Sequence, residues 1–342
     1  MNAQLESTVR RAPAARVPRL GFLGLGWIGR QRMQVLRASG AAEVAAIADT
    51  QPAALEAAAG DAPEAARAAS FDELFAHDLD GLVIATPSGA HAWQAIAALK
   101  RGVAVFCQKP LARTAAEAAQ VVAAARRAGC LLEVDYSYRH LAGMAALREA
   151  IRAGELGELY AIDLVFHNAY GPDKPWFDDL AQSGGGCVMD LGIHLIDLVG
   201  WMSGASAADA LDARLYAGGR ALEPPPGCVE DYAVAHWRTD GGACVRLACS
   251  WRLQAGCDAV IEASFYGTRG GAALRNVGGS FYDFTLERFD GTRREQLAGP
   301  PDAWGGRALV RWAERLAAGE GYDEDCERLV DVHRIVDRIY GR

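Results

Sequence analysis

Apolar positions between residues 20 and 136 fall in short runs that alternate with longer, alanine-rich segments. The short runs are rich in Val, Ile, Leu and Phe, as buried strands are, and the alanine-rich segments have the length of helices. This alternation predicts βαβ units and therefore an α/β domain with a parallel, doubly wound sheet. We expect strands over 20–23, 44–48, 82–85, 103–107 and 131–136, and helices over 28–39, 52–59, 72–76, 90–100 and 114–128.

The pattern changes after about residue 140, and from residue 229 onward longer stretches alternate apolar and polar positions. Turn sequences such as Thr239-Asp240-Gly241-Gly242 separate these stretches, which is typical of β-hairpins. The second half is therefore predicted to be α+β with a mostly antiparallel sheet. We expect strands over 159–167, 230–238, 243–252, 258–266, 271–275 and 281–289, and helices over 144–153, 188–202 and 323–340.

Composition narrows the class of protein. A chain of 342 residues, of which 51% are apolar, is long enough for two globular domains. The formal charge of −8 argues against a nucleic-acid-binding surface, which would need a basic face. No run of about 18 uncharged apolar residues occurs, which argues against a membrane-spanning helix. Residues 1–18 carry Arg10-Arg11 without the apolar segment of an export signal, so we interpret them as a disordered leader.

The cysteines give no indication of a disulfide framework or a metal site. Eight of them are scattered along the chain, with no CxxC pair and no Cys/His cluster at metal-ligand spacing. Reduced thiols in a cytoplasmic protein without bound metal are therefore expected.

One glycine-rich turn carries the strongest functional indication. Gly24-Leu25-Gly26-Trp27-Ile28-Gly29 follows the first predicted strand and opens a helix, and Asp49 ends the next strand, 20 residues beyond Gly29. In a dinucleotide site the three glycines permit a tight turn, approach of the pyrophosphate and close helix packing. A carboxylate at Asp49 would bind the ribose hydroxyls and repel a 2′-phosphate, which favours NAD over NADP. The alternatives are a glycine turn of another α/β protein and a strand-end cap at Asp49.

Two further turns follow predicted parallel strands, at the sheet edge where α/β proteins bind ligands. The first is Thr86-Pro87-Ser88-Gly89-Ala90-His91, where Ser88 suits a helix N-cap and the turn suits cofactor contact. The second contains Gln108-Lys109-Pro110. Only three of the 35 basic residues are lysines, so a lysine here suggests a compact ammonium group, which arginine does not offer. A surface lysine before a turn proline is the alternative.

Polar residues interrupt the most apolar predicted helix. Asp190, His194 and Asp197 lie at i, i+4 and i+7, on one helical face among Leu and Ile neighbours. Buried ionisable groups need a polar partner or a cleft, and histidine suits a general base for a hydroxyl proton. A hydrogen-bonded core histidine with its carboxylate is the alternative. A metal site is disfavoured because Asp-x3-His lacks a third ligand at a suitable spacing.

With these motifs assembled, the chain resembles the glucose–fructose oxidoreductase / inositol dehydrogenase / rhizopine catabolism (Gfo/Idh/MocA) family over about residues 19–340. The motifs are GLGWIG at 24–29, ATPSGAH at 85–91, QKP at 108–110, YRH at 138–140 and GGGCVMDLGIHLID at 184–197. Residues 230–243 and 265–271 look like its C-terminal sheet. The resemblance implies a Rossmann domain (19–138), an α+β substrate and oligomerisation domain with a large open sheet (139–322), and a C-terminal helix (323–342) that packs back on the first domain.

The resemblance also implies a function. Family members are NAD(P)-dependent dehydrogenases acting on a CH–OH group of a sugar, cyclitol or related polyol, and a homodimer or homotetramer through the C-terminal sheet is expected. Lys109, Asp190 and His194 resemble the family's catalytic residues. Predicted cofactor contacts are Gly24, Gly26, Trp27, Ile28, Gly29, Asp49, Thr86, Pro87, Ser88, His91, Gln108 and Lys109. Predicted substrate contacts are Arg139, His167, Tyr170, Lys174, Trp176, Asp190 and His194.

Two positions depart from the family pattern. Gln108 stands where the family usually has Glu, and Asp135 stands where a small residue is common; the sequence offers no account of Asp135. Two other classes of function also stay open. One is a regulatory protein that binds NAD(H) without turnover, and the other is a sugar-processing hydrolase or lyase that uses NAD as an internal redox relay.

Overall fold

The computed structural model describes residues 16–206 and 208–342. The predicted leader therefore lies outside the described residues, except for 16–18.

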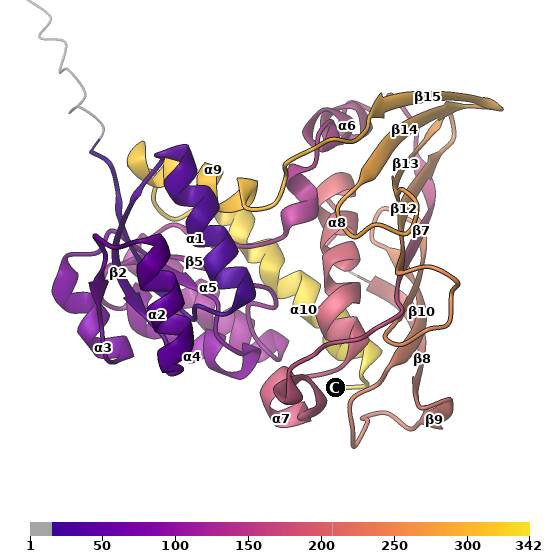
Figure 1. Cartoon of the computed structure of the whole chain (residues 1–342). Helices are drawn as coiled ribbons and strands as arrows, with labels where there is room; N and C mark the ends of the chain where they lie inside the picture. Colours follow the sequence, from indigo (N-terminus) through magenta and orange to yellow (C-terminus); the bar gives the residue numbers. More distant parts are fainter. Residues whose placement is uncertain (1–15, 207) are drawn as a thin grey trace, which may run out of the picture.

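The first part of the chain forms a six-stranded sheet, and every strand pair in it is parallel. The strand order β3-β2-β1-β4-β5-β6 confirms the predicted doubly wound fold, with helices on both faces (Figure 1). In such a sheet the strand order reverses between β1 and β4, and ligands bind beyond the carboxyl ends of these strands. The strands are β1 (Arg19–Leu23), β2 (Glu43–Ala48), β3 (Ala66–Arg67), β4 (Gly81–Ile84), β5 (Ala104–Cys107) and β6 (Leu132–Val134). The helices are α1 (Trp27–Ser39), α2 (Pro52–Asp61), α3 (Phe71–Leu74), α4 (Ser88–Leu99) and α5 (Ala115–Ala128).

Local signals explain where these helices begin and end. Helix α5 begins at Thr114, whose side chain accepts a hydrogen bond from the backbone N–H of Glu117, and ends at Gly129 in the left-handed conformation. Helix α1 ends in the same way at Gly40.

The second part forms a nine-stranded, mostly antiparallel sheet in the order β15-β14-β13-β12-β7-β11-β10-β8-β9, which confirms the predicted α+β domain. Only β7 and β11 pair in parallel. Strands β8, β9 and β15 were not predicted, because most of their residues are exposed or half-buried and they lack a regular apolar alternation. The strands are β7 (Leu159–Asn168), β8 (Ala208–Ala217), β9 (Arg220–Leu222), β10 (Tyr232–Thr239), β11 (Cys244–Ser250), β12 (Ala259–Gly267), β13 (Gly271–Asn276), β14 (Phe284–Asp290) and β15 (Arg293–Ala298).

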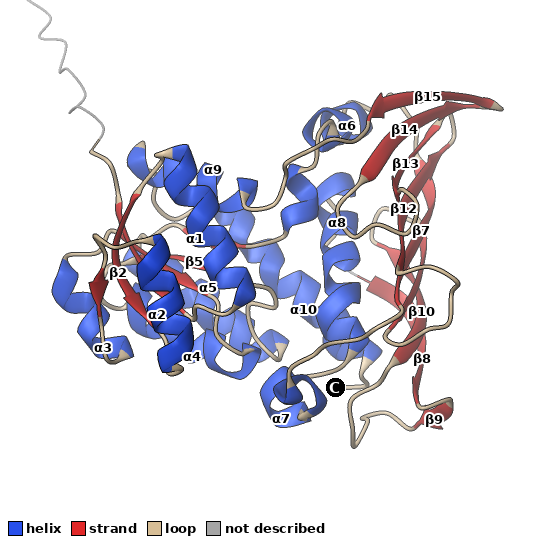
Figure 2. Cartoon of the chain, viewed as in Figure 1, coloured by secondary structure: helices blue, strands red, loops and turns tan. Residues whose placement is uncertain are grey.

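Helix α8 (Ile193–Ser203) packs on the inner face of this sheet, and α6 (Met144–Arg152) packs against α8 (Figure 2). Within the described ranges no helix covers the outer face. That face carries a hollow of about 330 Å³ lined by side chains of β7, β8, β10 and β11.

Two C-terminal helices pack against the domain of the first sheet. Helix α9 (Arg307–Ala317) was not predicted; it packs against α1, and its buried Trp312 lies 5.7 Å from the ring of Phe106. It therefore joins the core of the first sheet although it falls in the range expected for the second domain. Helix α10 (Arg328–Ile339) runs between the two halves and contacts both α5 and α8 (Figure 1).

One segment, Leu180–Ser203, has the length and composition of a membrane-crossing helix. However, 78% of its most apolar window is buried inside the protein, as in the core helix of a globular domain.

Candidate active site

The three glycines of the first turn differ in what fixes them. Gly24 has a φ of +87° and lies so close to Ala85 that a Cβ atom would come within 2.5 Å of its backbone. A Cβ at Gly29 would overlap with the carbonyl oxygen of Gly24. Gly26 is different, because a Cβ there would meet no protein atom within 4 Å. The fold thus requires Gly24 and Gly29, whereas Gly26 faces open space.

This open space fits a pyrophosphate. Gly26 is the N-cap of α1, and no side chain of the described residues caps that helix, so its first N–H groups are free to bind an anion. Asp49 lies beside the turn: its Oδ2 accepts a hydrogen bond from the N–H of Leu25 at 2.6 Å, and its Oδ1 accepts from Gln51 at 2.7 Å. The strand-end cap is therefore real, and it holds the carboxylate beside the glycine turn. Trp27 is 68% exposed at the same turn.

The turn after β4 is held from inside the protein. His91 is buried, and its two ring nitrogens lie 2.7 Å from the carbonyl oxygens of Pro110 and Thr86. Burial, opposed by these two hydrogen bonds, lowers the pKa of His91. His91 therefore ties the turns after β4 and β5 together, and its ring has no free nitrogen for the predicted cofactor contact. Pro87 occupies the N-cap position of α4 and makes no side-chain capping hydrogen bond. The prediction that Ser88 is the N-cap is therefore wrong, because Ser88 is the first residue of the helix.

Lys109 follows β5 and points at the segment before α8. Its Nζ donates hydrogen bonds to the Oδ1 of Asp190 at 2.6 Å and to the backbone oxygen of Asp190 at 2.8 Å. The other carboxylate oxygen, Oδ2, accepts a hydrogen bond from the indole Nε1 of Trp251 at 3.1 Å. The two side chains are only 20% and 15% exposed, so the pair is mostly buried but still reached by solvent. Trp251 was not identified from the sequence, because it follows β11, 61 residues away from Asp190.

The glycine run before Asp190 is explained by a buried carboxylate. Glu230 accepts hydrogen bonds from the N–H groups of Gly186 and Val188, each at 2.9 Å, and from the hydroxyl of Tyr340 at 2.8 Å. A Cβ at Gly185 would overlap with the Tyr340 hydroxyl, and one at Gly186 with the backbone of Glu230. This packing fixes the start of the π-helical turn η4 (Val188–Gly192), which carries Asp190.

His194 lies one turn further, on α8, against the rings of Tyr136 and Tyr138, whose centroids are 6.2 and 5.1 Å from its own. Burial lowers the pKa of His194 well below its ordinary value; Lys109 and Arg32 lower it further, whereas Asp135 raises it. Its Nδ1 is buried without a hydrogen-bond partner among the described residues. The ring is therefore neutral at pH 7 and can accept a proton.

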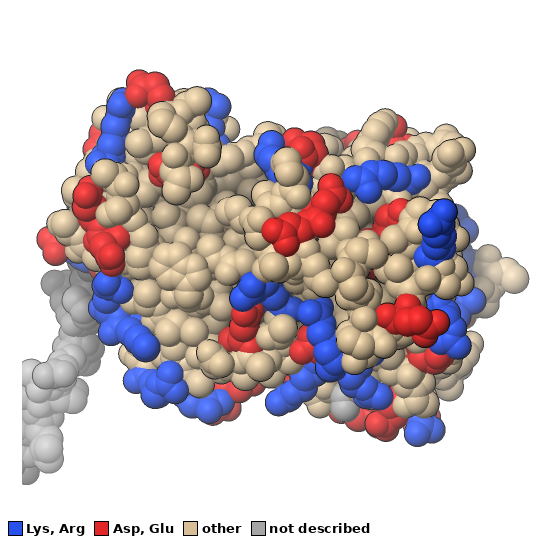
Figure 3. All heavy atoms as spheres, turned by 90° about the horizontal axis from the view of Figure 1, so that it is seen from below, with Lys and Arg blue, Asp and Glu red and all other residues tan. Residues whose placement is uncertain are grey.

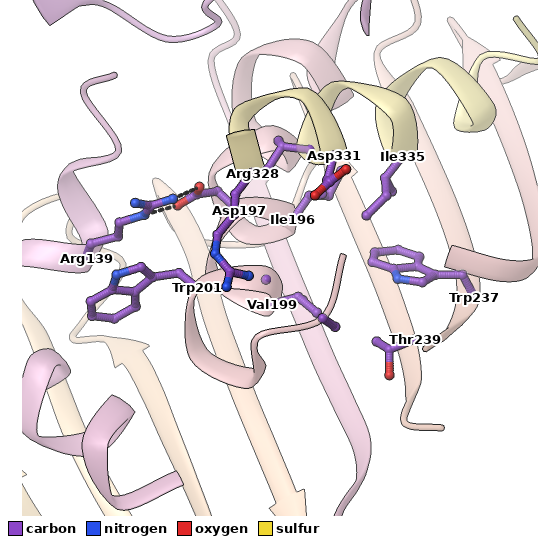
Figure 4. Close-up of a pocket in the computed structure, with 13 residues that line it drawn as sticks. Arg139, Ile196, Asp197, Val199, Trp201, Trp237, Thr239, Arg328, Asp331 and Ile335 are labelled. Carbon is purple, nitrogen blue, oxygen red and sulfur yellow. Dashed lines mark hydrogen bonds and ion pairs between the residues drawn. The ribbon is translucent and has the colours of Figure 1, made fainter. Parts of the chain in front are cut away.

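Asp197, the third polar residue predicted on this helical face, has a different partner. Asp197 is buried and forms a two-point ion pair with Arg139, whose Nε lies 2.7 Å from Oδ2 (Figure 4). Its carboxylate is therefore paired with Arg139, whereas the carboxylate of Asp190 is paired with Lys109. The Arg139–Asp197 pair lines a small cavity of about 10 Å³, room for one water molecule. Arg139, a predicted substrate contact, thus has its guanidinium engaged by Asp197.

The other predicted substrate residues surround the loop after β7. His167 contacts the hydroxyl of Ser250 through Nδ1 at 2.8 Å, and Tyr170 is exposed and donates to Asp258. Lys174 is exposed and pairs with its neighbour Asp173 at 3.1 Å. Trp176 stacks on Phe177 with centroids 3.8 Å apart, and Phe177 lies edge-on to Trp251. This row of rings connects the loop to Asp190.

Gln108, a predicted cofactor contact, is instead buried, and its amide donates to the carboxylate of Asp135. No group of three or more His, Cys, Asp or Glu side chains in residues 16–206 and 208–342 could hold a metal ion. On the face in Figure 3, acidic and basic side chains are interspersed and do not gather in a basic patch.

Comparison with known proteins identifies the family. The profile described as "Oxidoreductase family, NAD-binding Rossmann fold" matches residues 18–136, and the "GFO/IDH/MocA C-terminal domain" profile matches residues 144–273. The chain belongs to the Gfo/Idh/MocA oxidoreductase family.

Relatives within the Gfo/Idh/MocA family agree with this assignment. A putative UDP-kanosamine synthase oxidoreductase subunit of Amycolatopsis mediterranei is 34% identical over 276 residues, which cover 75% of each chain. The rhizopine catabolism protein MocA of Rhizobium meliloti is 32% identical over 186 residues, 54% of this chain and 57% of that relative. Other relatives are named inositol 2-dehydrogenase, D-apiose dehydrogenase and D-glucoside 3-dehydrogenase.

Solved structures share the fold. The aldose-aldose oxidoreductase of Caulobacter crescentus, complexed with glycerol, superposes with a TM-score of 0.81 over 95% of this chain and 97% of its own, at 21% identity.

Proposed function

We propose that this protein is an NAD-dependent oxidoreductase that transfers a hydride between a secondary hydroxyl, or ketone, of a sugar, cyclitol or related polyol and the nicotinamide. The observation that carries this proposal is the Lys109–Asp190 pair beside the neutral His194, at the sheet edge next to the glycine turn. The names of the relatives point to the same class of substrate.

When bound, the cofactor supplies the hydride chemistry. His194 is the general base that takes the hydroxyl proton, because its ring is neutral at pH 7. Lys109 stabilises the developing alkoxide through its ammonium group. Asp190 orients that ammonium group by accepting two of its hydrogen bonds, and Trp251 holds the carboxylate of Asp190 from the other side.

The preference for NAD over NADP rests on Asp49. Its carboxylate lies beside the glycine turn and would repel a 2′-phosphate, and the following residues Thr50, Gln51 and Pro52 carry no positive charge to offset this.

The loop after β7 supplies the substrate contacts in this proposal. Trp176 and Tyr170 offer apolar faces on which a sugar ring can stack, and His167 offers a polar group for a hydroxyl. Lys174 would add affinity for an anionic sugar, although its ammonium now pairs with Asp173.

The test is nicotinamide reduction by the purified protein, with NAD or NADP, across inositols, aldoses, sugar acids and sugar phosphates. We expect NAD-linked turnover that falls by about 10²–10⁴-fold in both His194→Ala and Lys109→Met. Near-normal turnover in both variants would contradict the assigned roles. Binding of NADH without turnover of any substrate would favour the regulatory class. Retained cofactor, with product formed and no net NADH, would favour the hydrolase or lyase class.

We also propose that the protein is a cytoplasmic homodimer or homotetramer joined through the uncovered face of the nine-stranded sheet. Apolar residues such as Val165 and Val234 lie there beside Asp163 and Arg246, which pair with each other at 2.7 Å. Light scattering after size exclusion would test this, and Val234→Glu is expected to shift the mass toward a monomer.

A further inference from the structure

A buried ion pair lies behind the proposed catalytic residues, and the roles assigned above do not use it. The Nε of Arg32, on α1, lies 2.6 Å from the Oδ2 of Asp135, just after β6, and the two side chains are 8% and 0% exposed. The same oxygen accepts a hydrogen bond from the amide of Gln108, and the hydroxyl of Ser137 donates to Oδ1. Arg32 also donates to Ser137 at 3.1 Å and to Gln31.

This network connects the two halves of the site. Arg32 lies on the helix whose N-terminus faces the predicted pyrophosphate, and Gln108 directly precedes Lys109. The backbone N–H of Asp135 also donates to the carbonyl oxygen of Cys107 at 2.9 Å. Through Asp135, the position of α1 therefore constrains the turn that carries Lys109.

The network also places one negative charge near His194. Burial raises the pKa of Asp135, but the charge of Arg32 and the hydrogen bonds from Ser137, Arg32 and Gln108 outweigh it, so that the pKa is lowered and the group stays a carboxylate. The charges of Lys109 after β5, Asp135 after β6 and Arg32 on α1 act on His194, and the rings of Tyr136 and Tyr138, in the segment that follows Asp135, lie against it. Among these, Asp135 favours the protonated ring.

We propose that Asp135, held by Arg32, is a positioning residue: it fixes the Lys109 turn against α1 and supplies the negative charge that supports a proton on His194. The proposal rests on the function proposed above. Gln108 is the partner that makes it possible, because an amide donates to Asp135 where a second carboxylate would repel it. The network thus needs one carboxylate beside Arg32. A glutamate at position 108 could supply this carboxylate if position 135 carried an amide instead.

An exchange of the two side chains tests this. Arg32 and Gln108 donate to the same oxygen, so their donor atoms lie within two hydrogen-bond lengths, about 6 Å, of each other. In Gln108→Glu/Asp135→Asn the carboxylate would remain near Arg32, and the new amide at position 135 would donate to it. We expect this double variant to return to within about threefold of wild-type kcat, although each single variant loses about tenfold or more.

The single variants have separate signatures. Asp135→Asn removes the negative charge, so the titration of His194, followed by NMR and assigned with His194→Gln, moves to lower pH. The acidic limb of the kcat/KM profile moves with it. Gln108→Glu brings two carboxylates together, so its melting temperature falls at pH 8, and the loss shrinks as the pH falls and one of them takes up a proton. Asp61→Asn, which breaks the ion pair between Arg30 on α1 and Asp61 at the end of α2, is the matched control and should change none of these.

If Asp135→Asn does not fold, Gln108→Met decides the positioning role, because it keeps the ion pair and removes only the side-chain link between Asp135 and the Lys109 turn. A roughly tenfold loss of kcat with unchanged NADH affinity is expected; unchanged kcat would overturn that role. The proposal is also overturned if Asp135→Asn lowers only the melting temperature while His194 titrates as before, or if the double variant is no better than the poorer single one. A wild type without turnover would overturn the proposed function alone, since the titration and the melting cycle need no substrate.

Discussion

The glycine turn gives the sharpest prediction, because two glycines of one motif should respond in opposite ways. We predict that Gly26→Ala folds normally and loses cofactor binding. Gly26 has a φ of −62°, which an alanine adopts without strain, and the added Cβ would meet no protein atom within 4 Å. The change in the free energy of unfolding should therefore stay within about 1 kcal/mol, with the entropy of the unfolded chain partly offsetting the poorer N-cap.

The effect on the cofactor follows from the same geometry. The methyl group would occupy the open space next to the first N–H groups of α1, where the pyrophosphate must approach. Loss of one hydrogen bond to a charged group is worth about 1.5–3 kcal/mol, which corresponds to about 10–150-fold in Kd. Titration of NADH fluorescence, together with thermal unfolding of the free protein, measures both quantities.

Two matched variants complete the experiment. Gly29→Ala would overlap with the carbonyl oxygen of Gly24, so it should be destabilised by several kcal/mol. Gly60→Ala, in α2, adds a methyl group to open space on another helix and should leave the NADH affinity unchanged. A Gly26→Ala protein that binds NADH within twofold of wild type would refute the assignment of the pyrophosphate site.

Three further predictions concern single side chains. Trp251→Phe removes the 3.1 Å hydrogen bond to Asp190 and keeps the aromatic packing, so kcat should fall about tenfold in steady-state assays with little change in melting temperature; an unchanged kcat would exclude a positioning role for the indole. Asp49→Ser should reduce the ratio of kcat/KM for NAD to that for NADP by about tenfold or more, because it removes the charge that repels a 2′-phosphate; a constant ratio would show that Asp49 acts only as a cap. Burial, with the charges of Arg139 and Arg311, lowers the pKa of His140 to about 4. The folded protein then binds fewer protons than the unfolded chain below pH 6.5, so stability is lost as the pH falls from 6.5 toward 4, and His140→Asn should flatten this slope in urea unfolding.

The sequence alone determined the class of fold and the outline of the site. Short apolar runs alternating with alanine-rich segments predicted the parallel sheet, because burial on both faces leaves a local trace in each strand. The glycine turn, Lys109 and the Asp190–His194 spacing were also visible, since each lies within a few residues of the strand or helix that positions it.

The tertiary structure decided which polar groups meet. Asp135 had no account in the sequence, and its partner Arg32 lies 103 residues away. Trp251 and Glu230 likewise reach the Asp190 segment from distant parts of the sequence, and Asp197 pairs with Arg139 instead of joining Lys109 and Asp190. Periodicity reports how a residue is buried within its own strand or helix, but it carries no information about a partner brought close by the packing of another. The sequence therefore predicted the main catalytic candidates of this site, whereas the ion pairs that orient these side chains exist only in the folded chain.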